Sequence, residues 1–170
     1  MIQRKQSIYL FLAGVILLIT YFVPLANFIG ESNSLVLYIY QVISLVPGTE
    51  TGLSPYFVLP LLTSISLVII ISFITIFLYK KRKSQLLLVR FMLLLILVYI
   101  GLYFFHYMDV LENLSGGYAS YEFGLVIPGI DIQIPTIIFI IPLVTAMLLF
   151  MAARGIVSDE KLIRSTDRLR

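Results

Sequence analysis

The reactive side chains of this 170-residue sequence are few, because it has one histidine, His106, and no cysteine. Without cysteine there are no disulfides, thiolate metal sites or cysteine nucleophiles. A single histidine also argues against a zinc site or a bis-histidine haem built from one chain. The chemistry left for His106 is proton or quinone handling, and an enzyme would need it to converge with an outer carboxylate such as Asp109.

The segment YIGLYFFHY places tyrosines at 99, 103 and 107, so that they recur every four residues beside His106. Tyrosines at the end of an apolar helix are typical of the aromatic belt at the membrane interface. We therefore expect these rings to lie at headgroup level.

Six carboxylates form the other group that could act chemically: Glu31, Glu50, Asp109, Glu112, Glu122 and Asp131. Their spacing matches no EF-hand loop, and no base adjoins them for acid–base work. The sequence also lacks a Gly-rich phosphate loop, a GxSxG motif and an HExxH motif. We expect no enzyme, no bound metal and no cofactor.

Hydroxyl side chains gather in one apolar stretch, at Thr63, Ser64, Ser66, Ser72 and Thr75. Small hydroxylated residues let membrane helices approach closely and hydrogen-bond across the contact. This pattern predicts a helix facing the interior of a bundle. A conduction pathway is the alternative, although no charged residue lies at membrane depth to support it.

The elements that carry these residues are long apolar segments. The chain is 60% hydrophobic and 12% charged, against roughly 25% charged in soluble domains, and its mean hydropathy is +1.03. Crossing a bilayer core of about 30 Å takes about 20 helical residues. Four segments are long enough, namely residues 7–28, 56–79, 86–107 and 134–153. The first follows the basic start MIQRKQ, and we expect an uncleaved anchor because its apolar run exceeds that of a signal peptide.

The basic residues predict the orientation of these spans. All twelve lysines and arginines lie before the first span, at or just after the turn 80–85 between the second and third, or in the tail 154–170. That side sums to +9, whereas the loops 29–55 and 108–133 sum to −6. The positive-inside rule then places both termini in the cytoplasm and the two loops in the periplasm. The main determinants are Arg4, Lys5, Lys80, Lys81, Arg82, Lys83, Arg90 and Arg154.

The outer loops carry strand patterns. Residues 35–40 are rich in β-branched and aromatic residues, and residues 121–127 lead through Pro128-Gly129 into the alternating segment 130–134. A lone hairpin is marginally stable, so we expect the 35–40 strand to join it, with an interfacial helix as the alternative for that segment. The predicted fold is an all-α integral membrane bundle of four transmembrane helices, N-in/C-in, with a small extracytoplasmic antiparallel β-sheet.

Four prolines fall within the predicted spans. Pro24 and Pro142 lie in the interiors of the first and fourth spans and predict kinks. Pro60 and Pro135 lie in the first turns of the second and fourth, where a proline costs little.

The tail SDEKLIRSTDRLR has seven charged residues among thirteen. Gly155 is expected to interrupt the fourth helix, and Ser158 to begin a new one. Its apolar edge could meet lipid or a partner, or the tail could be a solvated basic end that only fixes topology. The candidate partner contacts are Leu162, Ile163, Arg164, Arg168, Leu169 and Arg170.

Three segments together, MIQRKQSIYLFLAG, YKKRKSQLLLVR and DEKLIRSTDRLR, resemble an uncharacterised family of four-helix inner-membrane proteins from Bacteroidota, a domain of unknown function. The resemblance implies the inner membrane of a Gram-negative cell and no catalytic residue. Four helices below a small sheet are also similar to claudin-type proteins in topology alone, since their tryptophan and paired cysteines are absent.

These features favour a non-enzymatic accessory or scaffold subunit. Its partners would be the lipid bilayer and a membrane protein or a second copy of the chain, and the placement of the charges explains the net charge of +3 without nucleic acid. The alternative is a small transporter or a lipid- or quinone-handling protein, with kinked first and fourth helices around the hydroxyl-rich second.

Overall fold

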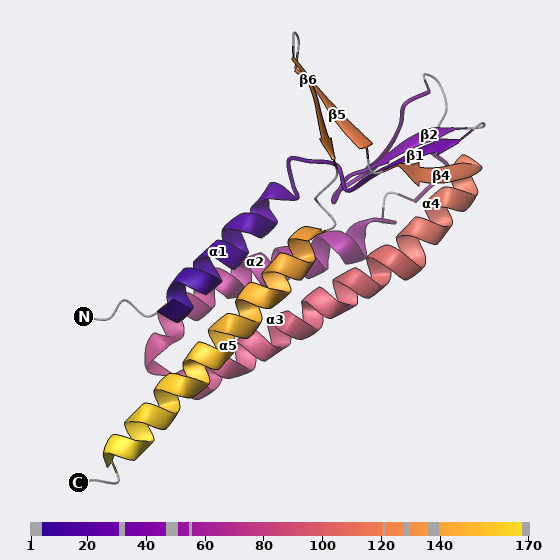
Figure 1. The fold of residues 1–170 in the computed structure, drawn as a ribbon. Helices are drawn as coiled ribbons and strands as arrows, with labels where there is room; N and C mark the ends of the chain where they lie inside the picture. Colours follow the sequence, from indigo (N-terminus) through magenta and orange to yellow (C-terminus); the bar gives the residue numbers. More distant parts are fainter. Residues whose placement is uncertain are drawn as a thin grey trace.

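The computed structural model describes residues 5–30, 33–46, 51–54, 56–120, 122–127, 130–135 and 140–167. Four long helices form a bundle, and a small sheet lies at one end of it (Figure 1). The helices are α1 (Lys5–Ile19), α2 (Leu59–Phe77), α3 (Arg82–Leu102) and α5 (Ile140–Asp167). The first and last described residues, Lys5 and Asp167, lie at the end away from the sheet (Figure 1).

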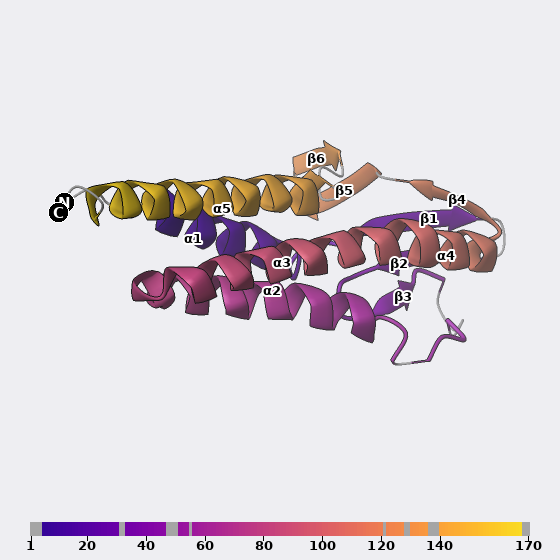
Figure 2. The same cartoon turned by 90° about the horizontal axis from the view of Figure 1, so that it is seen from below.

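In the bundle, α1 and α3 each contact both α2 and α5. Figure 2 shows the helices running lengthwise beside one another, with the strands at one end. Its core is apolar and runs the length of the helices, with fully buried side chains that include Leu10, Leu17, Ile65, Met92 and Ile96. The short turn between α2 and α3 is the 3₁₀ segment η1 (Leu78–Lys80), so these two helices form the predicted antiparallel hairpin.

Large apolar side chains also cover the outside of the bundle. Phe77, Leu87, Leu97 and Met147 are each between 65% and 79% exposed. Three helical segments are long and apolar enough to cross a membrane: Leu59–Phe77, Arg82–Ser115 and Ile140–Glu160. An apolar outer surface on helices of this length indicates a multi-pass membrane protein.

The first apolar segment is not one helix. α1 ends at Ile19, a turn follows that contains Pro24, and strand β1 (Ala26–Gly30) begins within the predicted span. Fifteen residues make a helix of about 22 Å, shorter than a bilayer core. The prediction of a helical span over 7–28 is therefore wrong in its second half, and Pro24 lies in the connection instead of kinking a helix.

The third helix is longer than predicted. α3 continues without a break through the π-helical turn η2 (Tyr103–Tyr107) into α4 (Met108–Ser115). It stops at Gly116, whose φ of 66° is the left-handed conformation that commonly ends helices. The predicted outer loop 108–133 therefore begins as a helix.

The fourth helix differs at both ends from its prediction. Strand β6 (Ile130–Pro135) occupies the start of the predicted span 134–153, so Pro135 ends a strand. Pro142 lies in the first described turn of α5, where it needs no kink. The helix then passes through Gly155 and Ser158 without interruption.

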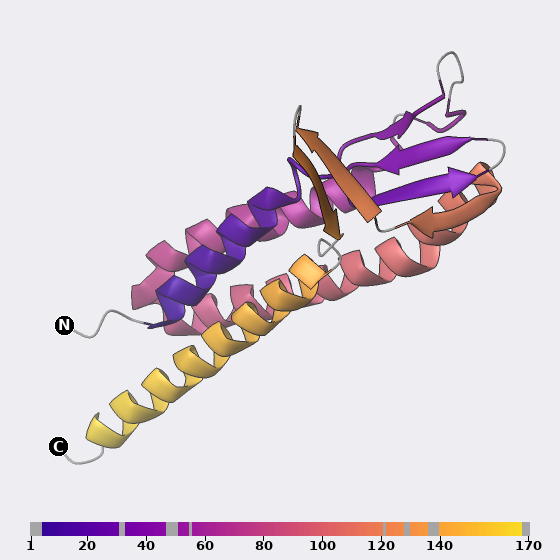
Figure 3. The same cartoon turned by 45° about the horizontal axis from the view of Figure 1, so that its top comes forward.

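The sheet has the antiparallel order β3-β2-β1-β4, formed by β3 (Val42–Ser44), β2 (Ser34–Leu37), β1 and β4 (Gly117–Ser120). The strand prediction for 35–40 is confirmed for its first half. Its partners are different, because β2 pairs with β1 and β3, while β5 (Glu122–Ile127) pairs only with β6 as a separate hairpin (Figure 3). The central strand β1 was missed because it lies inside an apolar run.

Two glycines allow the sheet to meet the end of α4. Gly30 pairs with Gly117 in the β1–β4 ladder. A Cβ on Gly30 would lie 1.9 Å from the carbonyl oxygen of Ser115, and one on Gly117 would lie 2.0 Å from that of Ile29. Only glycine fits at either position, and α4 packs against β1, β2 and β4 as a result.

Candidate functional site

Three of the five hydroxyl side chains of α2 lie against neighbouring helices, as the sequence predicts, whereas Thr63 is exposed and Ser66 is half-buried. Ser64, Ser72 and Thr75 are buried. The Ser72 hydroxyl donates to the carbonyl oxygen of Leu10 in α1 at 2.5 Å, while Ser64 and Thr75 donate to carbonyls of their own helix. These hydrogen bonds account for the three hydroxyl groups as packing contacts and do not require a conduction pathway.

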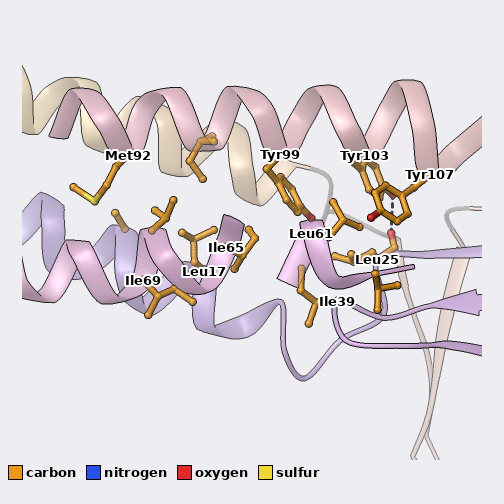
Figure 4. Close-up of a cluster of buried hydrophobic side chains, with 14 of the residues drawn as sticks. Leu17, Leu25, Ile39, Leu61, Ile65, Ile69, Met92, Tyr99, Tyr103 and Tyr107 are labelled. Carbon is orange, nitrogen blue, oxygen red and sulfur yellow. Dashed lines mark hydrogen bonds between the residues drawn. The ribbon is translucent and has the colours of Figure 1, made fainter. Parts of the chain in front are cut away.

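The tyrosines at 99, 103 and 107 point into the bundle (Figure 4). All three are buried. The Tyr103 hydroxyl donates to the carbonyl oxygen of Leu25 at 3.1 Å, and the Tyr107 hydroxyl donates to that of Phe57 at 2.7 Å. The expected aromatic belt is therefore wrong for these residues. Tyr103 and Tyr107 satisfy carbonyls of the irregular segments before β1 and α2, which would otherwise be left without partners in the core.

His106 lies on the outer side of the same turn and is exposed. Its ring centroid is 5.9 Å from that of Phe57 and 5.2 Å from that of Tyr107. Asp109, one turn later, is exposed as well. Among the described residues, no three His, Cys, Asp or Glu side chains gather in a way that could hold a metal ion. The surroundings of His106 are thus aromatic and suit packing more than acid–base chemistry.

The predicted topology determinants gather toward the end of the bundle away from the sheet. Lys81 and Lys83 are exposed beside η1, and Arg82 begins α3 with its Nη1 buried and without a hydrogen-bond partner. Lys5 begins α1, Lys80 ends η1, Arg90 lies two turns into α3 and Arg154 lies in the second half of α5. Arg4 lies outside the described residues.

Two buried amides join the helices at this basic end. Gln85 in α3 donates from Nε2 to the carbonyl oxygen of Thr75 at 3.2 Å, near the end of α2. Gln6 in α1 donates from Nε2 to Oδ2 of Asp159 in α5. A Cβ on Gly155 would lie 2.8 Å from Cγ of Gln6. Gly155 therefore makes room for Gln6, and Asp159 binds it instead of starting a separate tail helix.

A groove of about 430 Å³ lies between α3 and α5 near the same end. Its polar groups are the exposed side chains of Arg90, Arg154 and Ser158. The Arg154 guanidinium lies 5.6 Å from the centroid of the Phe150 ring, within range of a cation–π interaction. The remaining walls are apolar: Leu86, Leu93, Ala153 and Val157.

The predicted contact residues of the tail are only partly within the described chain. Leu162, Ile163 and Arg164 belong to the last two turns of α5, which continues to Asp167. Arg168, Leu169 and Arg170 lie outside the described residues. The tail is therefore, as far as it is described, a straight continuation of a membrane helix.

With this geometry in hand, comparison with protein families gives one match. The family is Domain of unknown function (DUF4293), and it matches residues 2–134 and 130–169. The chain belongs to this family. No curated protein and no solved structure matches the DUF4293 chain. The expected membership of a family of unknown function is thereby confirmed.

The groove of this DUF4293 protein has no motif in the sequence that marks it. Arg90 and Arg154 are 64 residues apart and were interpreted singly as topology determinants. The available signal was local: Phe150, Arg154 and Ser158 are spaced by four and must share a helix face. Nothing in that spacing, however, indicates that α3 lies alongside.

Proposed function

We propose that this DUF4293 protein is a non-enzymatic accessory or scaffold subunit of the inner membrane in a Gram-negative bacterium of the Bacteroidota. Both termini lie in the cytoplasm, and the sheet, α4 and the β5–β6 hairpin lie in the periplasm. The protein contacts partner proteins through those periplasmic elements and through the basic end of α5.

One observation carries this proposal: the chain builds ordered structure beyond its apolar core at both ends of the bundle. On one side, α4 and four strands extend past η2. On the other, α5 continues through the charged segment as far as Asp167. Ordered elements outside the membrane are surfaces that partners can recognise, whereas residues that only fix topology need no structure of their own.

The packing of the bundle favours the accessory or scaffold role over the alternative of a transporter. Leu10, Leu17, Ile65 and Ile96 are all fully buried where the helices meet. The buried hydroxyl groups of α2 are hydrogen-bonded to backbone carbonyls. Intramembrane charges usually mark coupled transport, and the described core is lined by apolar side chains instead.

Cysteine labelling tests the orientation cleanly, because the natural chain has no cysteine. Ser84→Cys lies in the exposed turn region at the start of α3, and Asn113→Cys lies on the exposed face of α4. A membrane-impermeant maleimide applied to spheroplasts should label Asn113→Cys only, and Ser84→Cys only after lysis. Labelling of Ser84→Cys in intact spheroplasts would reverse the proposed orientation.

Site-specific photo-cross-linking tests the scaffold role. A photoreactive amino acid at Leu114, which is 40% exposed on α4, should capture one protein in stoichiometric yield. The matched control is Leu97, 66% exposed on the apolar face of α3, which should capture lipid. Purification of the chain as a lone monomer in mild detergent, with no cross-linked product at Leu114, would contradict the proposal.

The tail has its own test. Changing Leu162, Ile163 and Leu169 together to serine should release a partner held by the apolar edge while topology is retained. If only charge matters, that variant should behave as the natural chain, and changing Arg164, Arg168 and Arg170 to glutamate should be the harmful change.

A further inference from the structure

The groove between α3 and α5 has its two arginines near the middle of its length, with apolar residues on both sides of them. On α5, Phe150, Arg154 and Ser158 follow one another at intervals of four and therefore lie on one face. Phe150 is nearest the middle of the apolar segment, and Ser158 is nearest the basic end. Leu93 on α3 likewise lies deeper than Arg90. The arginine level is thus followed, toward the middle of the bundle, by an apolar part formed by Leu93 and Phe150, while Leu86 and Val157 lie on the side of the basic end.

The charged part is suited to a phosphate group. A guanidinium is a planar fork of donors that binds phosphate oxygens bidentately, and it stays protonated at all physiological pH values. Arg90 and Arg154 reach the groove from opposite walls, and the Ser158 hydroxyl adds one more donor. The volume of about 430 Å³ falls in the usual range of ligand pockets, about 300–1,000 Å³.

The position of Arg90 also favours pairing with an anion. It is the one charged residue in the apolar stretch 86–107, and a guanidinium beside hydrocarbon is costly unless it is paired or reaches the interface. Asp159, the acidic residue next to Ser158 in α5, accepts a hydrogen bond from Gln6 of α1 and is not among the residues that line the groove. A phospholipid phosphate held between the two arginines would pair with both guanidinium groups and offset one of their two positive charges at the level where lipid headgroups lie.

We propose that this groove binds one anionic phospholipid, with its phosphate between Arg90 and Arg154 and an acyl chain along Leu93 and Phe150. A lipid fits better than a soluble anion because the groove opens on the apolar outer face of two membrane helices. Basic pockets between transmembrane helices on the cytoplasmic side are suited to such headgroups. This site does not depend on the scaffold role, since lipid binding requires no protein partner.

Native mass spectrometry of the purified full-length chain tests the proposal. Dioleoyl phosphatidylglycerol should give a single retained lipid adduct, and dioleoyl phosphatidylcholine should bind at least several-fold more weakly. Each basic residue near a membrane surface contributes about fivefold to the attraction of anionic lipid, so Arg90→Gln with Arg154→Gln should weaken the adduct on the order of 25-fold. Lys81→Gln with Lys83→Gln removes the same charge outside the groove and should leave the adduct nearly unchanged.

A steric variant separates the site from general charge attraction. Ala153→Phe fills the groove and keeps every charge, so it should also lose the adduct. Circular dichroism and gel filtration of each variant establish that the bundle is intact.

Three outcomes would overturn the proposal: equal retention of the two lipids, equal loss in the Lys81/Lys83 control, or an unchanged adduct in Ala153→Phe. Tight binding of soluble glycerol phosphate without any preference for the lipid would identify a free-anion site instead. The cross-linking result at Leu114 is independent of these outcomes, because it tests the scaffold role and not the lipid site.

Discussion

The first and third apolar segments look alike in sequence but adopt different secondary structures. α1 stops after fifteen residues, and the remainder of its segment becomes a turn and a strand. The third segment runs from Arg82 to Ser115, which at 1.5 Å per residue is about 51 Å of helix. One segment falls short of a bilayer core of about 30 Å, and the other exceeds it.

The difference shows that an apolar run predicts that its residues are buried but does not predict whether they form a helix or a strand. Ala26 and Phe28 are fully buried as alternate residues of β1. Met108 and Leu111 are buried as successive turns of α4. Each segment supplies what the other needs, because β1 covers α4, and the close approach at Gly30 and Gly117 holds the two together.

The largest effect is expected from Gly117→Val, which breaks this contact directly. Its new Cβ would meet the Ile29 carbonyl oxygen and the Gly30 backbone, neither of which can move aside as a side chain can. Overpacking of this kind should cost about 3 kcal/mol or more of unfolding free energy, measured by denaturant titration in detergent.

The matched control is Gly101→Ala in α3, where an added Cβ meets no atom within 4 Å. It should cause no loss of stability and could add up to about 1 kcal/mol, because alanine favours a helix interior over glycine. Equal losses in the two variants would mean that the β1–β4 contact does not fasten the first segment to the third.

A smaller effect is expected from Tyr107→Phe, which leaves the shape of the third segment unchanged. It removes the 2.7 Å hydrogen bond to the Phe57 carbonyl and leaves that acceptor unsatisfied in the core, at a cost of about 1–3 kcal/mol. Thermal unfolding followed by circular dichroism measures the loss. Tyr56→Phe, at a position 74% exposed, provides the same chemical change as a control and should be nearly silent. A similar loss of stability at both positions would show that the Tyr107 hydrogen bond to Phe57 adds no particular stability.

The smallest effect is expected from Ser72→Ala, which tests how the short α1 is held. The hydroxyl group of Ser72 joins α2 to the Leu10 carbonyl of α1, and interhelical bonds in membranes average about 0.6 kcal/mol. Detergent unfolding should show a loss of that size. Thr63→Ala removes a hydroxyl that bonds only within α2, so a loss as large there would show that the α1 contact adds nothing.

The sequence predicted the parts of the fold that depend on hydropathy and local spacing. The α2 helix and the inward positions of Ser64, Ser72 and Thr75 follow from apolar length and hydroxyl residues. The turn between α2 and α3 was predicted at 80–85, whereas it lies at Leu78–Lys80 because α3 already begins at Arg82. Pro60, in the first turn of α2, is confirmed as well.

The sequence could not show the parts that depend on which segments meet. β1 could not be recognised because a buried apolar strand has the same sequence pattern as the end of a membrane helix. Pro24 and Gly30, which bracket that strand, were the signal available for it. Gly116 after Ser115 similarly marked the end of α4. The pairing of Arg90 with Arg154 had no such marker, because it arises only from the packing of α3 on α5.

The position of β1 at the centre of the sheet has a consequence for how the protein is made. Gly30 pairs with Gly117, which leaves the ribosome 87 residues later. At synthesis rates of about 5–20 residues per second, β1 waits on the order of 4 to 17 s for its second neighbour. During that interval the backbone groups along one edge of β1 are unpaired, and they can pair with β4 only after α3, η2 and α4 have been synthesised. The β1–β4 ladder is therefore the last part of the four-stranded sheet that can form, and it requires that the first and third apolar segments have both been synthesised.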